Sequence, residues 1–543
     1  MSFELLPLRA VDDPSDPVLV EVRDLPAPGR LTVRRLGEPV AELPVAVDGV
    51  VTLGALSAGG YGIELIAGDR AARTAVEVAG DGVRRLRYGF VTDYRPGRDL
   101  GGVTDNIRRL HLTDVQFYDW AYRHADLLGG GEVYHDALGQ PISLASVRGL
   151  VDRVHAAGAR ALGYAAVYGV SNDEWARWSY AALLTPSGQP YGLGDFLRLV
   201  DPADPGWREH FLDDLRAATE RLGFDGFHLD QYGYPKHATR PDGTAVAVED
   251  SFVTLIEAAR AALPDRRLVF NNVNDFPVWR TGTAPQDAMY IEVWPPHTTL
   301  NDLAAVVRKA HHAGAGKPVV IAAYQHVYDT SEVDAADRAA AFTMATLFSH
   351  GASHLLCGEA DRILVDPYYV RNHVVEASTA ALLKRWYDFL VEHIDLLHDP
   401  ALQDMTGALA GAYNDDCDVT YAGLGVTSEA AAGCVWRRIH GAGDRLILHL
   451  INLVGQDDTD WDAPRKPVAS LPGGTLRIRR SGPDLPRVRV ADPDLRPSLH
   501  DLPVTDDGDH AVVRLPSPHI WQLIVIDLNP SSASGAISVD NLT

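Results

Sequence analysis

The stretch GFDGFHLDQYG, residues 223–233, decides how the rest of the chain is interpreted. Its apolar centre has the length and composition of a buried strand, yet it delivers a carboxylate, Asp230, into a polar turn. Because side chains alternate along a strand, His228 and Asp230 share one face if Leu229 packs on the other. A buried strand with a polar tip is typical of a parallel sheet whose strand ends carry a functional site.

Seven further apolar segments flank this strand and alternate with amphipathic helical patterns, which indicates a parallel sheet built from βα units. The predicted strands are residues 88–94, 113–119, 161–168, 226–231, 268–273, 289–294, 318–324 and 353–358. Helices between them are expected to stop at left-handed glycines: Gly158, Gly223, Gly314 and Gly351. We therefore predict an α/β fold, a (β/α)8 TIM barrel. A doubly wound open sheet is the alternative, and it would need no eighth strand.

The sequence on either side of this region has the pattern of short strands separated by turns. Before residue 87, segments such as YGIELIAG (61–68) predict an N-terminal immunoglobulin-like β-sandwich. Segments such as DRLILHLINLV (444–454) predict a second β-sandwich after the barrel. The predicted domains are residues 1–86, the catalytic barrel at 87–399, the C-terminal sandwich at 400–530 and a flexible tail at 531–543.

Bulk composition excludes several classes of partner. The chain has 543 residues, 46% of them hydrophobic, and a formal net charge of -24. Nothing basic clusters to neutralise phosphates, so we expect neither nucleic acid nor an anionic membrane as a partner. No apolar run is long enough to span a bilayer, and the N-terminus lacks the pattern of a signal peptide, so we expect a cytoplasmic protein. The sequence makes no prediction of oligomeric state.

The three cysteines, Cys357, Cys417 and Cys434, show neither a disulfide framework nor metal-ligand spacing, although a single Cys417–Cys434 bridge stays open. We predict no metal and no cofactor.

Polar and aromatic residues gather where the predicted strands end, which in a barrel of this type is the active-site face. Carboxylates, amides and indoles converging on one face suit a sugar, whose hydroxyls need hydrogen-bond partners and whose ring faces stack on aromatics. The predicted substrate-binding residues are Asp93, Tyr118, Asp119, Trp120, His124, Tyr168, His228, Asn271, Asn274, Trp294, Tyr324 and Glu359.

Two carboxylates stand out within this set. Asp230 ends the fourth predicted strand and Glu292 lies on the sixth, so they face each other over the strand ends. Two opposed carboxylates are what glycoside hydrolysis requires, one at the anomeric carbon and one donating a proton. Apolar neighbours such as Val293 should raise the pKa of Glu292, while the amides and His228 should keep Asp230 ionised. A lone strand-end Asp is structural about half the time; convergence of so many polar tips favours function.

Six blocks, in this order, resemble glycoside hydrolase family 66, the dextranases and cycloisomaltooligosaccharide glucanotransferases. The blocks are RYGFVTDYRP (87–96), VQFYDWAYRH (115–124), GFDGFHLDQYG, FNNVND (270–275), YIEVWP (290–295) and LFSHGASHLLCGEADRILVDPYY (347–369). The resemblance covers roughly residues 87–395, and the flanking regions in arrangement only. It implies a retaining enzyme acting on α-1,6-linked glucans, with Asp230 as nucleophile and Glu292 as acid/base.

The expected substrate is dextran or an isomaltooligosaccharide. The glucanotransferases that this chain resembles carry a long carbohydrate-binding insertion within the barrel region, and no gap between the predicted strands holds one, which favours hydrolysis over cyclisation. Two alternatives stay open. One is a retaining α-glycosidase or transglycosylase on a different α-linked saccharide. The other is a catalytically inactive carbohydrate-binding protein.

Overall fold

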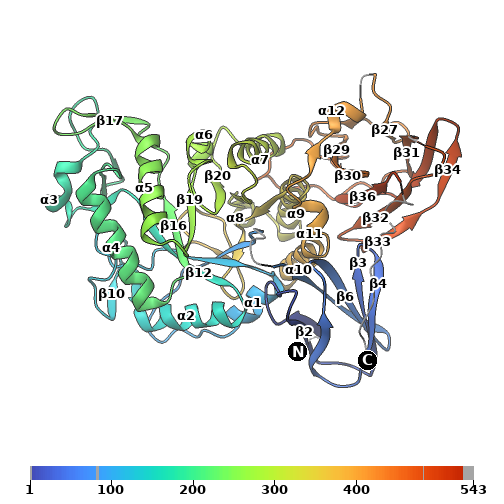
Figure 1. The fold of residues 1–543 in the computed structure, drawn as a ribbon, viewed down its shortest axis with the longest axis horizontal. Helices are drawn as coiled ribbons and strands as arrows, with labels where there is room; N and C mark the ends of the chain where they lie inside the picture. The colour runs from blue at the N-terminus through green and yellow to red at the C-terminus, as the bar shows by residue number, and fades with distance from the viewer. Residues whose placement is uncertain (1–2, 81–84, 412, 481, 530–543) are drawn as a thin grey trace.

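The computed structural model describes residues 3–80, 85–411, 413–480 and 482–529, so the predicted tail at 531–543 lies outside the described residues. Strands occupy the chain up to residue 78, strands and helices alternate from residue 88 to 397, and strands dominate from residue 403 onward. Figure 1 shows the α/β region at the left and centre, with the blue N-terminal sheets and the orange-to-red C-terminal sheets at the right.

Residues 4–78 form two antiparallel sheets, β1-β2-β5 and β4-β3-β6-β7, whose buried side chains share one hydrophobic cluster. Burial alternates along the strands: Val18, Val20 and Val22 of β2 are buried, as expected when one sheet face meets solvent. The strands are β1 (Glu4–Pro7), β2 (Pro17–Arg23), β3 (Gly29–Arg35), β4 (Glu38–Val45), β5 (Gly49–Ala55), β6 (Gly59–Ala67) and β7 (Arg70–Val78). The immunoglobulin-like topology and the boundary at residue 86 stay predictions.

The α/β region is built on a curled parallel sheet with the strand order β22-β21-β20-β19-β16-β12-β9-β8-β23. Each predicted strand overlaps an observed one, and the eighth is split: β22 pairs with β21, while β23, just downstream, pairs with β8. The strands are β8 (Tyr88–Val91), β9 (Asp114–Phe117), β12 (Arg160–Ala166), β16 (Gly226–Asp230), β19 (Arg267–Asn271), β20 (Ala288–Glu292), β21 (Val319–Ala322), β22 (Ala352–His354) and β23 (Cys357–Gly358). The segment at 352–358 thus contacts both ends of the parallel array.

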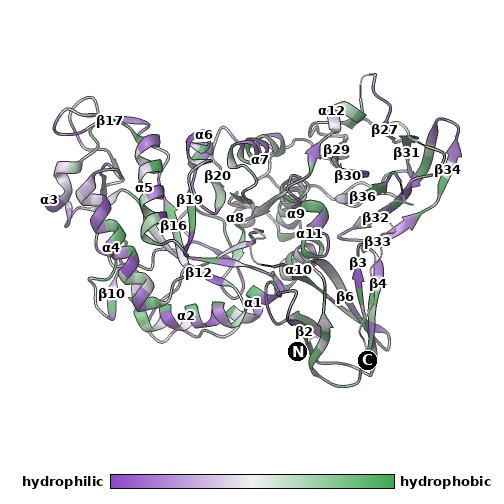
Figure 2. Ribbon diagram, in the orientation of Figure 1, coloured by the Kyte–Doolittle hydropathy of each residue, from purple (hydrophilic) through white to green (hydrophobic). Residues whose placement is uncertain are grey.

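Amphipathic helices lie between these strands, and local sequence sets their ends. α4 (Pro205–Leu222) begins at Asp204, whose carboxylate accepts from two main-chain N–H groups, and ends at Gly223 with a φ of 80°. Figure 2 shows hydrophobic and hydrophilic residues alternating along α4. The other long helices are α1 (Val103–Arg109), α2 (Leu144–Ala156), α5 (Val248–Ala262), α7 (Leu300–Gly314), α9 (Val333–Ser349) and α10 (Ala377–Glu392).

One of the four predicted helix stops is wrong. The other three glycines have left-handed backbone, but α7 continues through Gly314, and the left-handed residue that follows it is Ala315, with a φ of 48°. A Cβ on Gly314 would lie 2.6 Å from Met289 Cγ. Glycine at this position therefore permits close packing of α7 on β20 and does not form the turn.

Residues 403–527 form two more antiparallel sheets, β26-β29-β30-β36-β32-β33, with β28 beside β29, and β27-β31-β35-β34. The first packs on the α/β region, because the Trp521 ring lies 5.0 Å from that of Phe389 on α10. All three cysteines are free, so no Cys417–Cys434 bridge forms. The strands are β26 (Gln403–Asp404), β27 (Cys417–Thr420), β28 (Val426–Thr427), β29 (Val435–Ala442), β30 (Arg445–Asn452), β31 (Gly474–Arg479), β32 (Arg487–Asp492), β33 (Arg496–Leu502), β34 (Val504–Asp507), β35 (His510–Leu515) and β36 (Trp521–Asp527).

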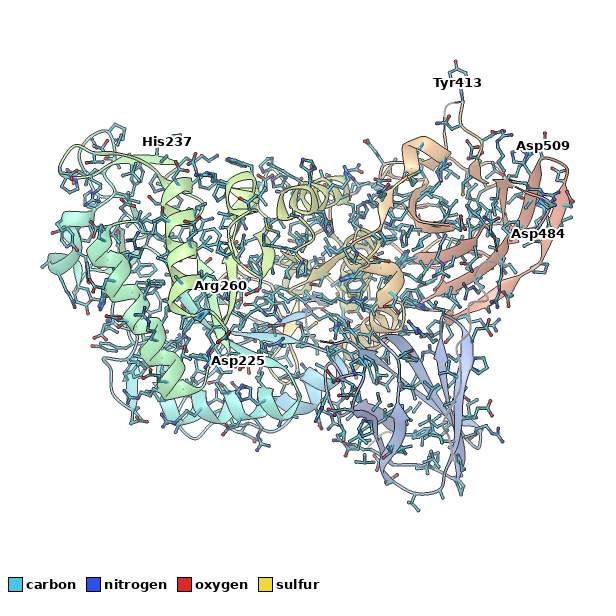
Figure 3. The ribbon with its side chains drawn as sticks, in the orientation of Figure 1. Asp225, His237, Arg260, Tyr413, Asp484 and Asp509 are labelled. Carbon is cyan, nitrogen blue, oxygen red and sulfur yellow. The ribbon has the colours of Figure 1, made fainter. Side chains whose placement is uncertain are left out.

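Short elements extend the carboxyl ends of the parallel strands. Figure 3 labels His237, shortly after β16, near the upper edge of the α/β region and Asp225, just before β16, well below it, so β16 runs toward the upper edge of the view. The short elements of the α/β region are β10 (Val133–His135), β11 (Pro141–Ser143), β13 (Gly169–Ser171), α3 (Trp175–Trp178), the 3-10 helix η1 (Ser179–Ala181), β14 (Gly192–Leu193), β15 (Leu197–Leu199), β17 (His237–Thr239), β18 (Ala245–Ala247), the 3-10 helix η2 (Val273–Asp275), α6 (Val278–Thr281), α8 (Val327–Thr330), β24 (Arg362–Ile363), β25 (His373–Val374) and α11 (Ile394–Leu397). The C-terminal region adds α12 (Thr406–Leu409).

A buried arginine joins the N-terminal sheets to the first parallel strand. Arg87 is fully buried, and its guanidinium donates to the carboxylate of Glu77 on β7 and to the carbonyl oxygens of Ala10 and His111. Such a contact is costly to break from one side, since the partner groups stay buried without their donor.

We expect Arg87→Met to lower the free energy of unfolding by about 2–5 kcal/mol, because it leaves the buried Glu77 with Arg85 as its one arginine partner and removes the donor of two buried carbonyls. Urea denaturation measures the loss. Arg30→Met is the matched control, since Arg30 pairs with Glu42 on the surface and should cost less than about 1 kcal/mol. Equal losses in the two variants would contradict the assignment.

Candidate active site

Two carboxylates at the strand ends share one hydrogen-bond donor. Asp230 is the last residue of β16, Glu292 the last of β20, and β19 between them ends in Asn271. The Asn271 side-chain NH2 donates to Asp230 Oδ1 at 2.8 Å and to Glu292 Oε2 at 2.9 Å. Only the NH2 group can donate to two carboxylates, so the neighbours fix the orientation of the amide. The distance between Asp230 Oδ1 and Glu292 Oε2 is therefore no greater than the sum of these two hydrogen-bond lengths.

Two tyrosines complete the hydrogen bonding of the pair. The Tyr164 hydroxyl donates to Asp230 Oδ2 at 2.7 Å, and the Tyr324 hydroxyl donates to Glu292 Oε1 at 3.0 Å. Each of the four carboxylate oxygens thus accepts from a neutral donor, and no Arg or Lys pairs with either carboxylate among the residues that the structure describes. The site holds its carboxylates in place without neutralising them.

Burial raises the pKa of both carboxyl groups. For Asp230 the donors Asn271 and Tyr164 oppose this by stabilising the ionised form. For Glu292 the negative charge of Asp230 adds to burial, so the pKa of Glu292 is raised further, against the donors Asn271 and Tyr324. The proton of the pair therefore belongs on Glu292 while Asp230 is ionised.

A cavity of about 680 Å³ opens over the two carboxylates, within the range of about 300–1,000 Å³ typical of small-molecule sites. Nine of the predicted residues line it: Tyr118, Asp119, His124, His228, Asp230, Asn271, Glu292, Trp294 and Tyr324. The structure therefore brings together the two predicted carboxylates and most of the aromatic and polar residues predicted to surround them.

Asp93 and Glu359 lie outside the cavity. Glu359 accepts from the main-chain N–H groups of Thr92 and Asp93 and pairs with Arg98, while Asp93 pairs with Arg95 at 2.6 Å. These contacts satisfy both carboxylates within the loop that follows β8. Asp93 and Glu359 therefore anchor a loop in this structure, and their contact with substrate stays a prediction.

Trp120, Tyr168 and Asn274 also lie outside the cavity. The Trp120 indole N–H donates to the Tyr164 carbonyl oxygen at 3.1 Å, and the Tyr168 hydroxyl donates to a main-chain carbonyl of the loop after β16. The Asn274 side-chain oxygen accepts from the Trp294 main-chain N–H at 2.6 Å. The Tyr168 hydroxyl also accepts from the main-chain N–H of Tyr232, so each of the three residues contacts a neighbour that lines the cavity. β12 ends at Ala166, so the tyrosine of this strand that lines the cavity is Tyr164, whereas Tyr168 lies beyond the strand end.

His228 lines the cavity but does not hydrogen-bond to Asp230. Its Nδ1 contacts the Tyr88 hydroxyl at 3.1 Å, and its ring lies among Tyr88, Tyr164 and Tyr290. Burial lowers the pKa of His228 to about 3, so the ring is neutral near neutral pH. The predicted contribution of His228 to keeping Asp230 ionised is corrected: Asn271 and Tyr164 perform that role.

Sequence reasoning missed Tyr164, which the strand period contained. Tyr164 pairs with His228 in the parallel register and lies two residues from Leu162, whose side chain belongs to the cluster inside the sheet. A count of inward positions would have found it. Other missed residues come from loops, where no periodicity applies. The remaining lining residues include Gln116, Leu138, Gln140, Leu193, Phe196, Gln231, Tyr232, Tyr290, Tyr368, Tyr369 and Arg371.

Across residues 3–80, 85–411, 413–480 and 482–529, no cluster of three or more His, Cys, Asp or Glu side chains could hold a metal ion. Within the same ranges, no helix combines the length and hydropathy needed to cross a bilayer.

The family model for glycosyl hydrolase family 66 matches residues 52–525, a span that includes both carboxylates and every residue lining the cavity. The chain belongs to this family. The match confirms the resemblance predicted from the six sequence blocks, and it extends over most of the chain.

Curated relatives of this family 66 chain have two printed activities. A cycloisomaltooligosaccharide glucanotransferase of Niallia circulans is 24% identical over 333 residues, which make up 56% of this chain and 34% of that protein. A dextranase of Streptococcus salivarius is 23% identical over 362 residues, 57% of this chain and 43% of that protein. These alignments span less than half the length of either relative.

A solved structure shares the fold of this family 66 chain. The crystal structure of a Paenibacillus sp. cycloisomaltooligosaccharide glucanotransferase complexed with cycloisomaltoheptaose matches with a TM-score of 0.85 at 18% identity. The match covers 96% of this chain and 100% of that chain. The mixed α/β architecture with flanking β-sheets is therefore common to both.

We expect Glu292→Gln to stabilise the protein at pH 8 by on the order of 1 kcal/mol. The pKa of Glu292 is raised in the folded state, so ionisation of this group lowers the free energy of unfolding. This loss of stability is absent below the unfolded pKa of about 4.3 and complete once the pH exceeds the folded pKa. Urea denaturation at pH 8 and pH 4 measures the difference, which should vanish at pH 4. Glu257→Gln, an exposed glutamate on α5, is the control and should change neither value. A gain that persists at pH 4 would point to a cause other than ionisation.

Proposed function

We propose that this protein hydrolyses α-1,6-glucosidic linkages of dextran or isomaltooligosaccharides with retention of anomeric configuration, through a covalent glycosyl intermediate on Asp230. The observation that carries the proposal is the Asn271 amide shared between Asp230 and Glu292. It sets two carboxylates side by side on the floor of a cavity of a size suited to sugar units.

The spacing of the carboxylates favours retention. Retaining glycosidases hold their two carboxyl groups about 5–5.5 Å apart, whereas inverting ones need about 6.5–9.5 Å to admit a water molecule between base and sugar. A single amide nitrogen that bonds to both groups at 2.8 and 2.9 Å keeps their nearest oxygens close together, which supports the narrower arrangement. Asp230 is then close enough to attack the anomeric carbon directly.

The proposed mechanism follows from the electrostatics of the pair. The ionised Asp230 attacks the anomeric carbon while Glu292 gives its proton to the departing glucosidic oxygen. Forming the ester removes the negative charge of Asp230, so the pKa of Glu292 falls and Glu292 becomes a base. It then takes a proton from water as the water oxygen attacks the anomeric carbon, which releases the sugar and restores both groups.

The proposal includes a (β/α)8 barrel as the catalytic scaffold. The pairing of β22 with β21 and of β23 with β8 supports it, because one short segment bridges both ends of the parallel array. An open doubly wound sheet has no such bridge. The linkage preference rests on the dextranase and glucanotransferase relatives.

Transfer to a sugar hydroxyl is the second candidate for the same site, and the glucanotransferase relatives favour it. The two reactions differ only in which oxygen attacks the intermediate. Product analysis of isomaltotriose digests separates them, since hydrolysis yields only shorter sugars and transfer yields longer ones.

We expect Glu292→Ala to lose about 10²–10⁴-fold in kcat on dextran, the usual contribution of a general acid, and Asp230→Ala to lose at least as much. The measurement is reducing-sugar release from dextran and isomaltooligosaccharides.

Azide rescue distinguishes the roles of the two carboxylates. Azide should restore turnover to Glu292→Ala with an α-glycosyl azide as product, and to Asp230→Gly with the β-glycosyl azide. Unimpaired sugar release by either alanine variant would rule out the assigned roles. Dextran binding without turnover by the wild type would favour a carbohydrate-binding protein.

We expect Tyr164→Phe to shift the acid limb of the kcat/KM profile to higher pH by up to about one unit, because Asp230 loses a donor that lowers its pKa. Rates of dextran cleavage between pH 4 and 8 measure the shift. Tyr328→Phe is matched chemically, since its hydroxyl donates to Asp337 away from the cavity, and its acid limb should stay in place. Identical profiles for the two variants would contradict the role of Tyr164.

A further inference from the structure

Trp279 is unusually exposed for a tryptophan in this protein. Seven of the ten tryptophans are buried, whereas Trp279 is 54% exposed, more than any other. It lies on α6, which Figure 1 shows along the upper edge of the α/β region between β17 and α7. This is the side toward which β16 runs and on which Asp230 and Glu292 are held.

A short chain of contacts joins Trp279 to the cavity wall. The Trp279 ring lies 5.7 Å from that of Phe276, edge to face. Gln231, which lines the cavity, donates from its side chain to the main-chain carbonyls of Phe276 and Asn271. The position of Trp279 is therefore tied, through Phe276, to the segment that carries the catalytic-site amide.

The backbone between the cavity and Trp279 is held in a strained form. Asn274 and Asp275 both have left-handed backbone, with φ of 50° and 59°, a conformation that costs energy for residues with a Cβ. Asn274 is fixed there by its side-chain contacts with the main chain of Trp294 and Pro295. Strain of this kind persists where the surrounding structure enforces it, often beside functional sites. Here it turns the chain outward, from the cavity floor to α6.

Charged groups border the exposed indole. The Lys309 ammonium lies 5.2 Å from the centre of the Trp279 ring, and it also pairs with Asp275 at 2.8 Å. The lysine holds one part of the indole in place, and more than half of the side chain stays open to solvent. A largely exposed indole bordered by charged side chains is suited to a sugar ring, which offers an apolar face and a rim of hydroxyls.

We propose that Trp279 is a remote binding position for a glucosyl unit of a long α-glucan chain, outside the cavity that holds Asp230 and Glu292. The inference deepens the proposed function and rests on it. A chain that extends out of the cavity along the β19–α6 segment meets Trp279, whereas a short oligosaccharide occupies the cavity and does not reach α6. The site therefore raises affinity for polymer without changing the chemistry.

Kinetics on two substrates test the site. In Trp279→Ala we expect kcat/KM on long linear dextran to fall about 2- to 10-fold through KM, the equivalent of one aromatic stacking contact. On isomaltotriose the same variant should match the wild type, and Trp279→Phe should retain most of the activity on dextran. Tyr413→Ala is the control, because Tyr413 is a fully exposed aromatic that projects from the C-terminal region in Figure 3 and should leave both substrates unaffected. Equal losses on both substrates, or no loss on dextran, would overturn the proposal.

Binding without turnover separates this proposal from the proposed function. Affinity electrophoresis in gels that contain dextran compares Glu292→Gln with the double variant Glu292→Gln/Trp279→Ala. Retardation of the first and weaker retardation of the second supports the site, even if the wild type cleaves neither substrate. Equal retardation of the two, or none in either, overturns it.

Discussion

One amide group, that of Asn271, determines the arrangement on which the site depends. Two carboxylates held this close repel each other when both are ionised, and burial strengthens the repulsion because little solvent screens it. A neutral donor placed between them lowers this cost without cancelling either charge. A lysine or arginine at the same position would neutralise the pair and lower both pKa values, which would deprive Glu292 of its proton near neutral pH.

The surroundings of the pair follow from the same constraint. Tyr164 and Tyr324 each satisfy one further oxygen with a neutral hydroxyl, and His228 nearby is kept neutral by burial. A polar site of this kind opposes stability, because buried carboxyl groups ionise at a cost. The scaffold compensates through an extensive apolar core between sheet and helices and through contacts such as Arg87 with Glu77.

The flanking sheets do not contribute to the lining of the cavity. None of the residues lining the cavity belongs to β1–β7 or to β26–β36, the strands of the described N- and C-terminal regions. The C-terminal sheet instead covers α9 and α10 of the α/β region, where Trp521 packs against Phe348 and Phe389. The segment from Asn271 to Trp279 is the part of the structure that connects the cavity to the outer surface, and it carries both a positioning amide and an exposed ring.

The sequence by itself determined the parallel strands, the strand ends that carry Asp230 and Glu292, and the family. These depend on local period and on residue order, which a linear chain displays directly. The sequence did not show which of Tyr164 and Tyr168 lines the cavity, because the residue at which a strand ends is set by its pairing with neighbouring strands. It also placed Asp93 and Glu359 at the site, since a carboxylate at a strand end looks the same whether it meets substrate or Arg98. Only the tertiary structure decided which tyrosine lines the cavity and which carboxylates lie outside it. Hydrogen-bond partners and burial depend on residues far apart in the chain that the fold brings together.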